Sequence, residues 1–328
     1  MDSNNIDQQP KSNLKKTWKK AIILTIAIIA TALIIVLAYP KTYDSPLQST
    51  SAISTPLPNQ TVSPTTVAPQ PVLTAKTNQP AVKKATAPAQ NKSINVAALS
   101  NAIYGWGQGL SFDSQNRPIN SINYQAKYGK LYNTDFIRLD SKYIYLTFDE
   151  GYENGYTLRI LDILKEKNVK AVFFITLSYA KDNPLLVKRM INEGHIIGNH
   201  SSTHPSNGMS SLSIDAQIQE IMACHDYIKS TFGYTPDLFR FPNGLYSEQS
   251  LAIVESCNYK SVFWSFAYKD YDTANQPDEK ESLELLTQRL HFGAIYLLHA
   301  VSKTNMDILA DFIDITRNKG YVFSSYND

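Results

Sequence analysis

The chain has 328 residues, with 31 Lys and Arg against 29 Asp and Glu, so its formal net charge is only +2. This balance excludes the strongly basic surface that is typical of nucleic-acid-binding domains. Two cysteines, Cys224 and Cys257, are too few for a disulfide framework and lack metal-ligand spacing, although one disulfide between them stays open. Prolines concentrate between Pro40 and Pro88, whereas all 13 glycines lie at or after Gly105, so the first third differs from the rest.

The first element in the chain is an uncharged apolar run at residues 21–39, which follows a basic tail at residues 1–20. At about 1.5 Å per residue the run spans roughly 28 Å, close to one hydrocarbon core. The lysines on its amino side predict a cytoplasmic amino terminus and an extracytoplasmic remainder, so we expect a single-pass protein of the cell membrane. A cleaved signal peptide is the alternative, although its apolar region is usually shorter.

Residues 40–97 are rich in Pro, Thr, Ser, Ala and Gln and contain no glycine. Such a composition cannot bury a core, and we expect an extended, disordered linker. A random coil of this length has an end-to-end distance of roughly 40 Å. We therefore interpret the segment as a spacer that lets the following domain reach into a wall layer.

Residues 98–140 have no clear period and are expected to form an irregular lead-in on the surface of the domain that follows. From 141 to 328, apolar runs alternate with helical patterns, which predicts an α/β fold with a parallel sheet. Polar residues follow several of the runs, as in barrel enzymes, so a distorted (β/α)7 TIM-like barrel is favoured over an open doubly wound sheet. The predicted strands are 143–148, 171–176, 195–198, 238–241, 261–266, 294–298 and 321–324.

Two motifs at strand ends indicate a metal site. Asp149 and Glu150 are adjacent carboxylates after the first strand, where a phosphate loop would otherwise begin, so one could ligate a metal while the other acts as a general base. His200 and His204 lie four residues apart and can chelate one ion, for which imidazole suits Zn²⁺. Solvated turn acids and exposed loop histidines are the competing interpretations.

Two later motifs indicate acyl chemistry. Arg240 can hold a carboxylate in a fixed fork, and the Pro-Asn-Gly turn at Asn243 exposes backbone N–H groups to an oxyanion. The alternative is a plain turn with a structural arginine. His299 directly follows a buried strand and can act as an acid or a base near neutral pH, although a satisfied core histidine is the competing interpretation.

Taken together and in this order, the motifs between Tyr143 and Ser324 resemble polysaccharide deacetylases, the metal-dependent carbohydrate esterases of family four. The strings TFDEGYENGYT (147–157) and LLHAVSK (297–303) are similar to the branch that deacetylates N-acetylmuramic acid and forms the δ-lactam of spore cortex. The resemblance implies a hydrolase of peptidoglycan glycan strands that acts during sporulation. It also implies dependence on an amidase that first removes the stem peptides.

The resemblance assigns roles to single residues of this chain. The implied catalytic residues are Asp149 as the base, Arg240 as its partner, His299 as the general acid and Asp270 as the acid that tunes His299. The implied ligands of a divalent metal, with Zn²⁺ as the expected ion, are Glu150, His200 and His204. The implied substrate-binding residues are Asn243 through its backbone N–H, Trp264 and Tyr271 in the pocket wall, and Leu298 at the acetyl methyl group.

Three departures from the family pattern stand out. Glu150 replaces the usual Asp and is one methylene longer, which puts the metal geometry in doubt. Asn243 replaces a usual Tyr, and Tyr271 replaces a frequent Trp. Three other functions stay open: deacetylation of N-acetylglucosamine in peptidoglycan or another exported glycan, an inactive wall-binding module that has lost its metal, and an adhesin on a Pro/Thr stalk.

Overall fold

The structure is a computed structural model that describes residues 95–328. The predicted membrane anchor at 21–39 and nearly all of the predicted linker lie outside these residues. Within residues 95–328, no helix is both long enough and apolar enough to cross a membrane.

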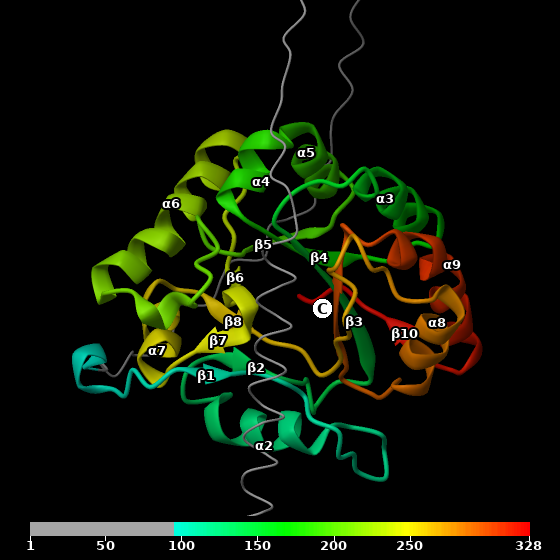
Figure 1. Ribbon diagram of the computed structural model, residues 1–328, viewed down its shortest axis with the longest axis horizontal. Helices are drawn as coiled ribbons and strands as arrows, with labels where there is room; N and C mark the ends of the chain where they lie inside the picture. The colour runs from blue at the N-terminus through cyan, green and yellow to red at the C-terminus, as the bar shows by residue number, and fades with distance from the viewer. Residues whose placement is uncertain (1–94) are drawn as a thin grey trace, which may run out of the picture. The chain divides into compact units, whose positions relative to one another are not determined.

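A curled parallel sheet forms the centre of the fold, with helices around its outer face (Figure 1). The strand order is β10-β3-β4-β5-β6-β8-β2, and β9 also pairs with β3. Every pairing in this sheet is parallel, which confirms the predicted α/β class. The strands are β2 Thr134–Asp135, β3 Tyr143–Glu150, β4 Ala171–Ile175, β5 Ile196–Asn199, β6 Leu238–Phe239, β8 Lys260–Val262, β9 Ile295–His299 and β10 Val322–Phe323.

The sheet curls into a half-barrel rather than the predicted (β/α)7 barrel. Each predicted strand position holds a strand, but β6 and β10 have only two residues each. After β8 the chain no longer forms a continuous strand, and it pairs with β9 through one isolated parallel bridge, Phe266 to Tyr296. The hydrogen bonding between β8 and β9 is therefore too limited to close a regular barrel.

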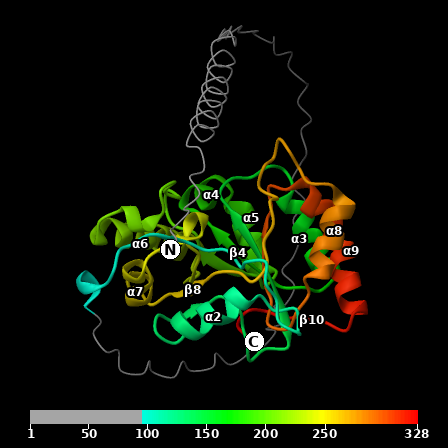
Figure 2. The same cartoon turned by 60° about the horizontal axis from the view of Figure 1, so that its bottom comes forward.

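Helices connect successive strands on the outside of the sheet (Figures 1 and 2). The longest of them, α6 (Ile214–Phe232), begins where the Ser213 side chain accepts a hydrogen bond from the Ala216 N–H, and it ends at Gly233 with φ 68°. The helices that follow β3 in the chain are α3 Thr157–Glu166, α4 Leu177–Asp182, α5 Pro184–Asn192, α6 Ile214–Phe232, α7 Glu248–Ser256, α8 Glu279–Gln288 and α9 Lys303–Asn318.

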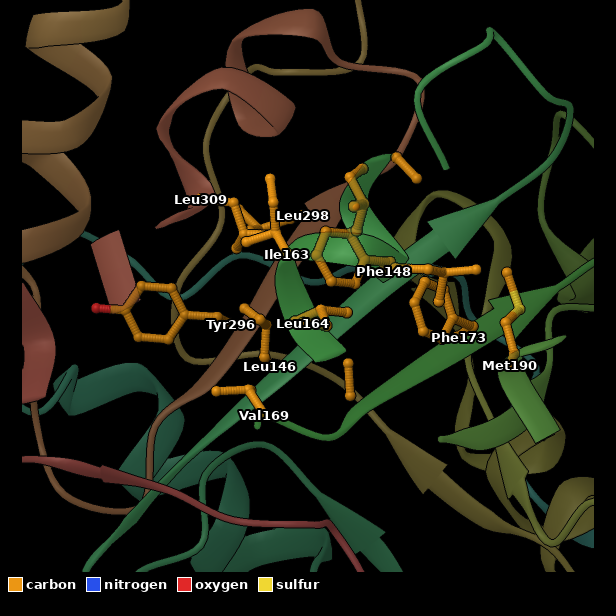
Figure 3. Packing of buried hydrophobic residues seen from close by; sticks show 14 of the residues in the cluster. Leu146, Phe148, Ile163, Leu164, Val169, Phe173, Met190, Tyr296, Leu298 and Leu309 are labelled. Carbon is orange, nitrogen blue, oxygen red and sulfur yellow. The ribbon is translucent and has the colours of Figure 1, made fainter. Parts of the chain in front are cut away.

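The main apolar core lies on the outer face of β3, β4 and β9 (Figure 3). Phe148 of β3 stacks on Phe173 of β4 with ring centroids 5.3 Å apart, and Leu298 of β9 belongs to the same cluster. Neighbouring residues of a strand point to opposite faces. Because Phe148 and Leu298 face the outer core, Asp149 and His299 face the inner side of the curled sheet.

Residues 98–140 are more ordered than the predicted irregular lead-in. They contain α2 (Ile119–Tyr128), the sheet strand β2, and β1 (Tyr104–Gly105), which pairs antiparallel with β7 (Leu245–Tyr246). The buried Trp106 and Phe136 pack in a second, aromatic core cluster. The segment shows no period in sequence because contacts with residues more than a hundred positions away order it.

Candidate active site

A cavity of about 800 Å³ opens at the carboxyl ends of the strands. The ends of parallel strands meet at one edge of a sheet, and this brings together motifs that are up to 150 residues apart. The lining includes Asp149, His200, His204, Phe241, Asn243, Trp264, Tyr268, Tyr271, Leu297 and His299.

Asp149 is bound by the fully buried Arg240. The Arg240 Nη1 donates to Asp149 Oδ1 and to Thr147 Oγ1, both at 2.8 Å, and Nε and Nη2 donate to backbone carbonyls of Val262 and Phe263. Burial alone would raise the pKa of Asp149, but the charge and hydrogen bond of Arg240, together with the charges of His200 and His299, hold that pKa below its usual value. Asp149 is therefore an ionised carboxylate near neutral pH.

The rings of His200 and His204 lie close together, with centroids 4.9 Å apart. Nδ1 of His200 donates to the Arg240 carbonyl oxygen at 2.8 Å, so Nε2 carries the free lone pair, and it lies 3.5 Å from Asp149 Oδ2. Burial lowers the pKa of His200 to about 4 and also lowers the pKa of His204. Both rings are thus neutral near pH 7, which is the form that ligates metals.

His299 is bound from behind by the fully buried Asp270. Oδ1 of Asp270 accepts from His299 Nδ1 at 2.7 Å, and Oδ2 accepts from the His299 backbone N–H at 2.8 Å and from Asn305 Nδ2 at 2.6 Å. Burial lowers the pKa of His299, but the charge and hydrogen bond of Asp270, together with the charge of Asp149, raise it above its usual value. The Nε2–H of this ring is then free to donate a proton.

Glu150 does not lie with the two histidines. It follows Asp149 on β3 and therefore faces the outer side, fully buried, where Oε1 accepts from Thr157 Oγ1 at 3.5 Å. Oε2 has no hydrogen-bond partner among residues 95–328. Burial, together with the charges of Glu153 and Asp149, raises the pKa of Glu150 well above its usual value. The predicted third metal ligand is thus corrected: strand alternation directs this carboxylate away from the cavity.

The remaining residues fit a divalent cation in part. His200 and His204 are neutral imidazoles on one loop, and the tautomer of His200 is fixed by a backbone carbonyl, as in many histidine metal sites. Within residues 95–328, no cluster of three His, Cys, Asp or Glu side chains forms a complete site. The structure thus offers two of the three ligands that the sequence predicts for Zn²⁺.

Three of the four predicted substrate-binding residues line the cavity. Trp264 forms part of its wall, and Tyr271, 56% exposed, lies with its ring 5.7 Å from that of His299. Asn243 lies in the short helix η3 (Pro242–Gly244) with φ 57°, and its Nδ2 donates to the Ser206 carbonyl at 3.3 Å. The side chain is thus directed to a neighbouring loop, consistent with a role for its backbone.

Leu298 does not line the cavity, which corrects its predicted role. It packs in the outer core beside Phe148 (Figure 3). Leu297, which points to the opposite face of β9, lines the cavity in its place.

Some side chains that support the site were not found from the sequence. Thr147 and Asn305 bind Arg240 and Asp270 respectively. Gln108 of the lead-in accepts from Trp264 Nε1 at 3.2 Å and donates to the Ala267 carbonyl at 2.9 Å. Thr147 shares a strand face with Asp149, and this alternation could have revealed it. The other two carry no local signal because their partners are distant in sequence.

Comparisons with known proteins agree with this architecture. Residues 137–262 match the polysaccharide deacetylase family. An uncharacterised 30.6 kDa protein of Geobacillus stearothermophilus is 44% identical over 241 residues, which cover 72% of this chain and 88% of that protein. Peptidoglycan-N-acetylmuramic acid deacetylase PdaA of Bacillus subtilis (strain 168) is 40% identical over 228 residues, which cover 65% of this chain and 86% of that protein.

A solved structure gives the same result. The structure of Bacillus subtilis PdaA, a family 4 carbohydrate esterase, matches with a TM-score of 0.65 and 36% identity, over 70% of this chain and 97% of that one. The paired Asp149 and His299 lie in a cavity at the carboxyl ends of the matched sheet. The chain therefore belongs to the polysaccharide deacetylase family, the family 4 carbohydrate esterases, and is a hydrolase that acts on N-acetyl amides.

Proposed function

We propose that the protein removes the acetyl group from N-acetylmuramic acid in peptidoglycan strands that lack stem peptides. The observation that carries the reaction type is the pairing of the ionised Asp149 with His299 at neighbouring strand ends. The 40% identity to PdaA supports the substrate class. We also propose that residues 21–39 form a membrane anchor that places the catalytic domain outside the cell, because peptidoglycan lies outside the cell membrane.

In the proposed mechanism, Asp149 takes a proton from water as the water attacks the acetamide carbon. The backbone N–H near Asn243 stabilises the oxyanion, and one such donor is typically worth roughly 3–4 kcal/mol. His299 then gives a proton to the leaving amine, acetate departs and the sugar keeps a free amine. His200 and His204 would hold a divalent cation, with Zn²⁺ as the first candidate, and when bound it would supply Lewis acidity toward the carbonyl and lower the pKa of water.

The free amine can close on the lactyl carboxyl of the same sugar to give muramic δ-lactam. This closure is intramolecular, so the high effective molarity of the carboxyl favours it. The carboxyl must not be joined to a stem peptide. The proposal therefore includes an amidase that acts before this enzyme and removes the peptide.

The test uses the full chain in detergent with added Zn²⁺ and glycan strands with and without stem peptides, followed by muramidase digestion and mass spectrometry. We expect loss of acetyl from peptide-free muramic acid, abolished by a chelator, and a further loss of water on lactam closure. Acetyl loss only from glucosamine would instead make the protein an N-acetylglucosamine deacetylase. No change on either substrate, with no bound zinc, would favour a wall-binding module.

A further inference from the structure

The loop that carries His200 and His204 is bound by one side chain of a helix outside the cavity. Oε2 of Glu220, on α6, accepts from the backbone N–H of Ser202 at 3.0 Å and of Thr203 at 2.9 Å. Its Oε1 accepts from Thr203 Oγ1 at 2.8 Å, and the Ser202 hydroxyl donates to the Glu220 carbonyl at 2.9 Å. All four hydrogen bonds join Glu220 to Ser202 or Thr203, which lie between the two histidines in the loop.

The backbone of this loop is strained at both ends. Ser201 has φ 69° and His204 has φ 52°, in the left-handed region that residues other than glycine seldom adopt. Such residues persist only where their surroundings over-determine them. Near the ends, Asn199 Oδ1 accepts from the Ser201 N–H at 2.9 Å, and Ser201 Oγ accepts from the His204 N–H at 3.0 Å. Between these ends, the backbone N–H groups of Ser202 and Thr203 donate to the Glu220 carboxylate.

A cation bound by two histidines requires both rings at fixed positions. The rings of His200 and His204 are 4.9 Å apart, and the loop that sets this spacing has left-handed φ angles at Ser201 and His204. We propose that Glu220 is a positioning residue that keeps the loop in its cation-binding conformation before a cation arrives. The proposal rests on the cation site of the proposed function, but it assigns a role to a residue that does not line the cavity.

The test compares Glu220→Ala and Glu220→Gln with Asp226→Ala, a control at an exposed acid on the same helix. Zn²⁺ is titrated calorimetrically into metal-free full-length protein, and hydrogen exchange of the Ser202 and Thr203 amides is measured without metal. We expect Glu220→Ala to weaken Zn²⁺ binding by about 10- to 100-fold and to speed exchange. In Glu220→Gln the amide oxygen can still accept from the two N–H groups, so we expect Zn²⁺ affinity to fall by less than about tenfold. The Asp226→Ala control should match the wild type.

Unchanged exchange in Glu220→Ala would overturn the proposal, and so would faster exchange with unchanged Zn²⁺ affinity, because the role would then be structural only. If Glu220→Ala fails to fold, Thr203→Val removes only the hydroxyl bond to Glu220 and should still weaken Zn²⁺ binding. A wild-type protein that binds no Zn²⁺ would contradict the cation of the proposed function. The exchange measurement would then still decide whether Glu220 holds the loop.

Discussion

Asp149 and His299 are register partners at the carboxyl ends of the adjacent parallel strands β3 and β9. Each is held from behind by a buried opposite charge, Arg240 on the carboxylate and Asp270 on the imidazole. Arg240 lowers the pKa of Asp149 and Asp270 raises that of His299, although burial opposes both shifts. The sheet thus presents a base and an acid side by side, each in the charge state that amide hydrolysis needs.

Replacing either member of this pair should remove turnover while the domain stays folded. Asn at position 149 keeps an acceptor for Arg240 but cannot take a proton, and Gln at position 299 cannot donate one at neutral pH. We expect each variant to lose about 10²- to 10⁴-fold in kcat. Acetate release measures turnover, and circular dichroism checks the fold. More than a tenth of wild-type activity in a folded variant would remove that residue from its role.

Asp270→Asn should move the alkaline limb of the kcat/KM profile to lower pH. His299 must be protonated to act as an acid, and the charge of Asp270 is what raises its pKa above the usual value. Without that charge the ring loses its proton at lower pH, so activity falls earlier as pH rises. The profile is measured by acetate release, with Asp226→Asn as an exposed control. An unmoved limb would assign the acid to another group.

Arg240→Met should destabilise the domain and move the acid limb of the profile to higher pH. The variant leaves Asp149 as a buried charge without a partner, which typically costs about 3–5 kcal/mol. The pKa of Asp149 should rise, because Arg240 is the charge that lowers it against the effect of burial. Protonating Asp149 removes the unpaired charge, so the stability deficit should shrink as pH falls. Urea unfolding at pH 5 and pH 7 tests this, and an equal deficit at both values would contradict it.

Glu150→Gln should leave Zn²⁺ affinity within about twofold of the wild type. The carboxylate lies on the outer face of β3, and burial raises its pKa well above the usual value, which favours a neutral form that glutamine copies in shape. Calorimetric titration with Zn²⁺ and thermal unfolding measure the two effects, and the melting temperature should not fall. A tenfold or larger loss of Zn²⁺ affinity would restore Glu150 as a ligand.

Gln108→Ala should raise KM several-fold with little change in kcat. Gln108 binds both the Trp264 indole and the Ala267 carbonyl, so it ties one cavity wall to the lead-in. A looser wall weakens the binding of the substrate and of the transition state equally, so KM rises while kcat stays the same. Steady-state kinetics on glycan strands test this, with the exposed Gln115→Ala as a control in the same segment. A fall in kcat at constant KM would contradict a wall role.

The alternation of apolar runs with helical patterns was enough to predict the parallel sheet, and the polar residues after those runs predicted the edge at which the cavity lies. The family resemblance implied that Leu298 and Glu150 face the cavity, because it assigns roles by position in a motif. Strand alternation decides these two cases. Phe148 packs in the outer core, so Glu150, two residues on, must face the same way, and Leu298 faces away from its neighbour His299.

The supporting residues could not be predicted, for a different physical reason. Asn305, Gln108 and Glu220 are polar residues on ordinary helical or irregular segments, and nothing in their neighbours distinguishes them. Their roles arise from the partners described above, which are 17 to 159 positions away along the chain. Such pairings become visible only when the fold brings the segments together. The order within residues 98–140 was missed for the same reason.

Arg240 contacts the site through both its side chain and its backbone. The guanidinium binds Asp149, while the backbone carbonyl of the same residue orients the His200 ring. The acidity of the base and the tautomer of a cation-binding imidazole are therefore linked through one peptide unit. A side-chain change at this position alters the charge that Asp149, His200 and His299 experience, but it keeps the backbone carbonyl that orients the His200 ring. A change in the length of the loop after β6 would disturb both, so attempts to alter the working pH range should leave that loop intact.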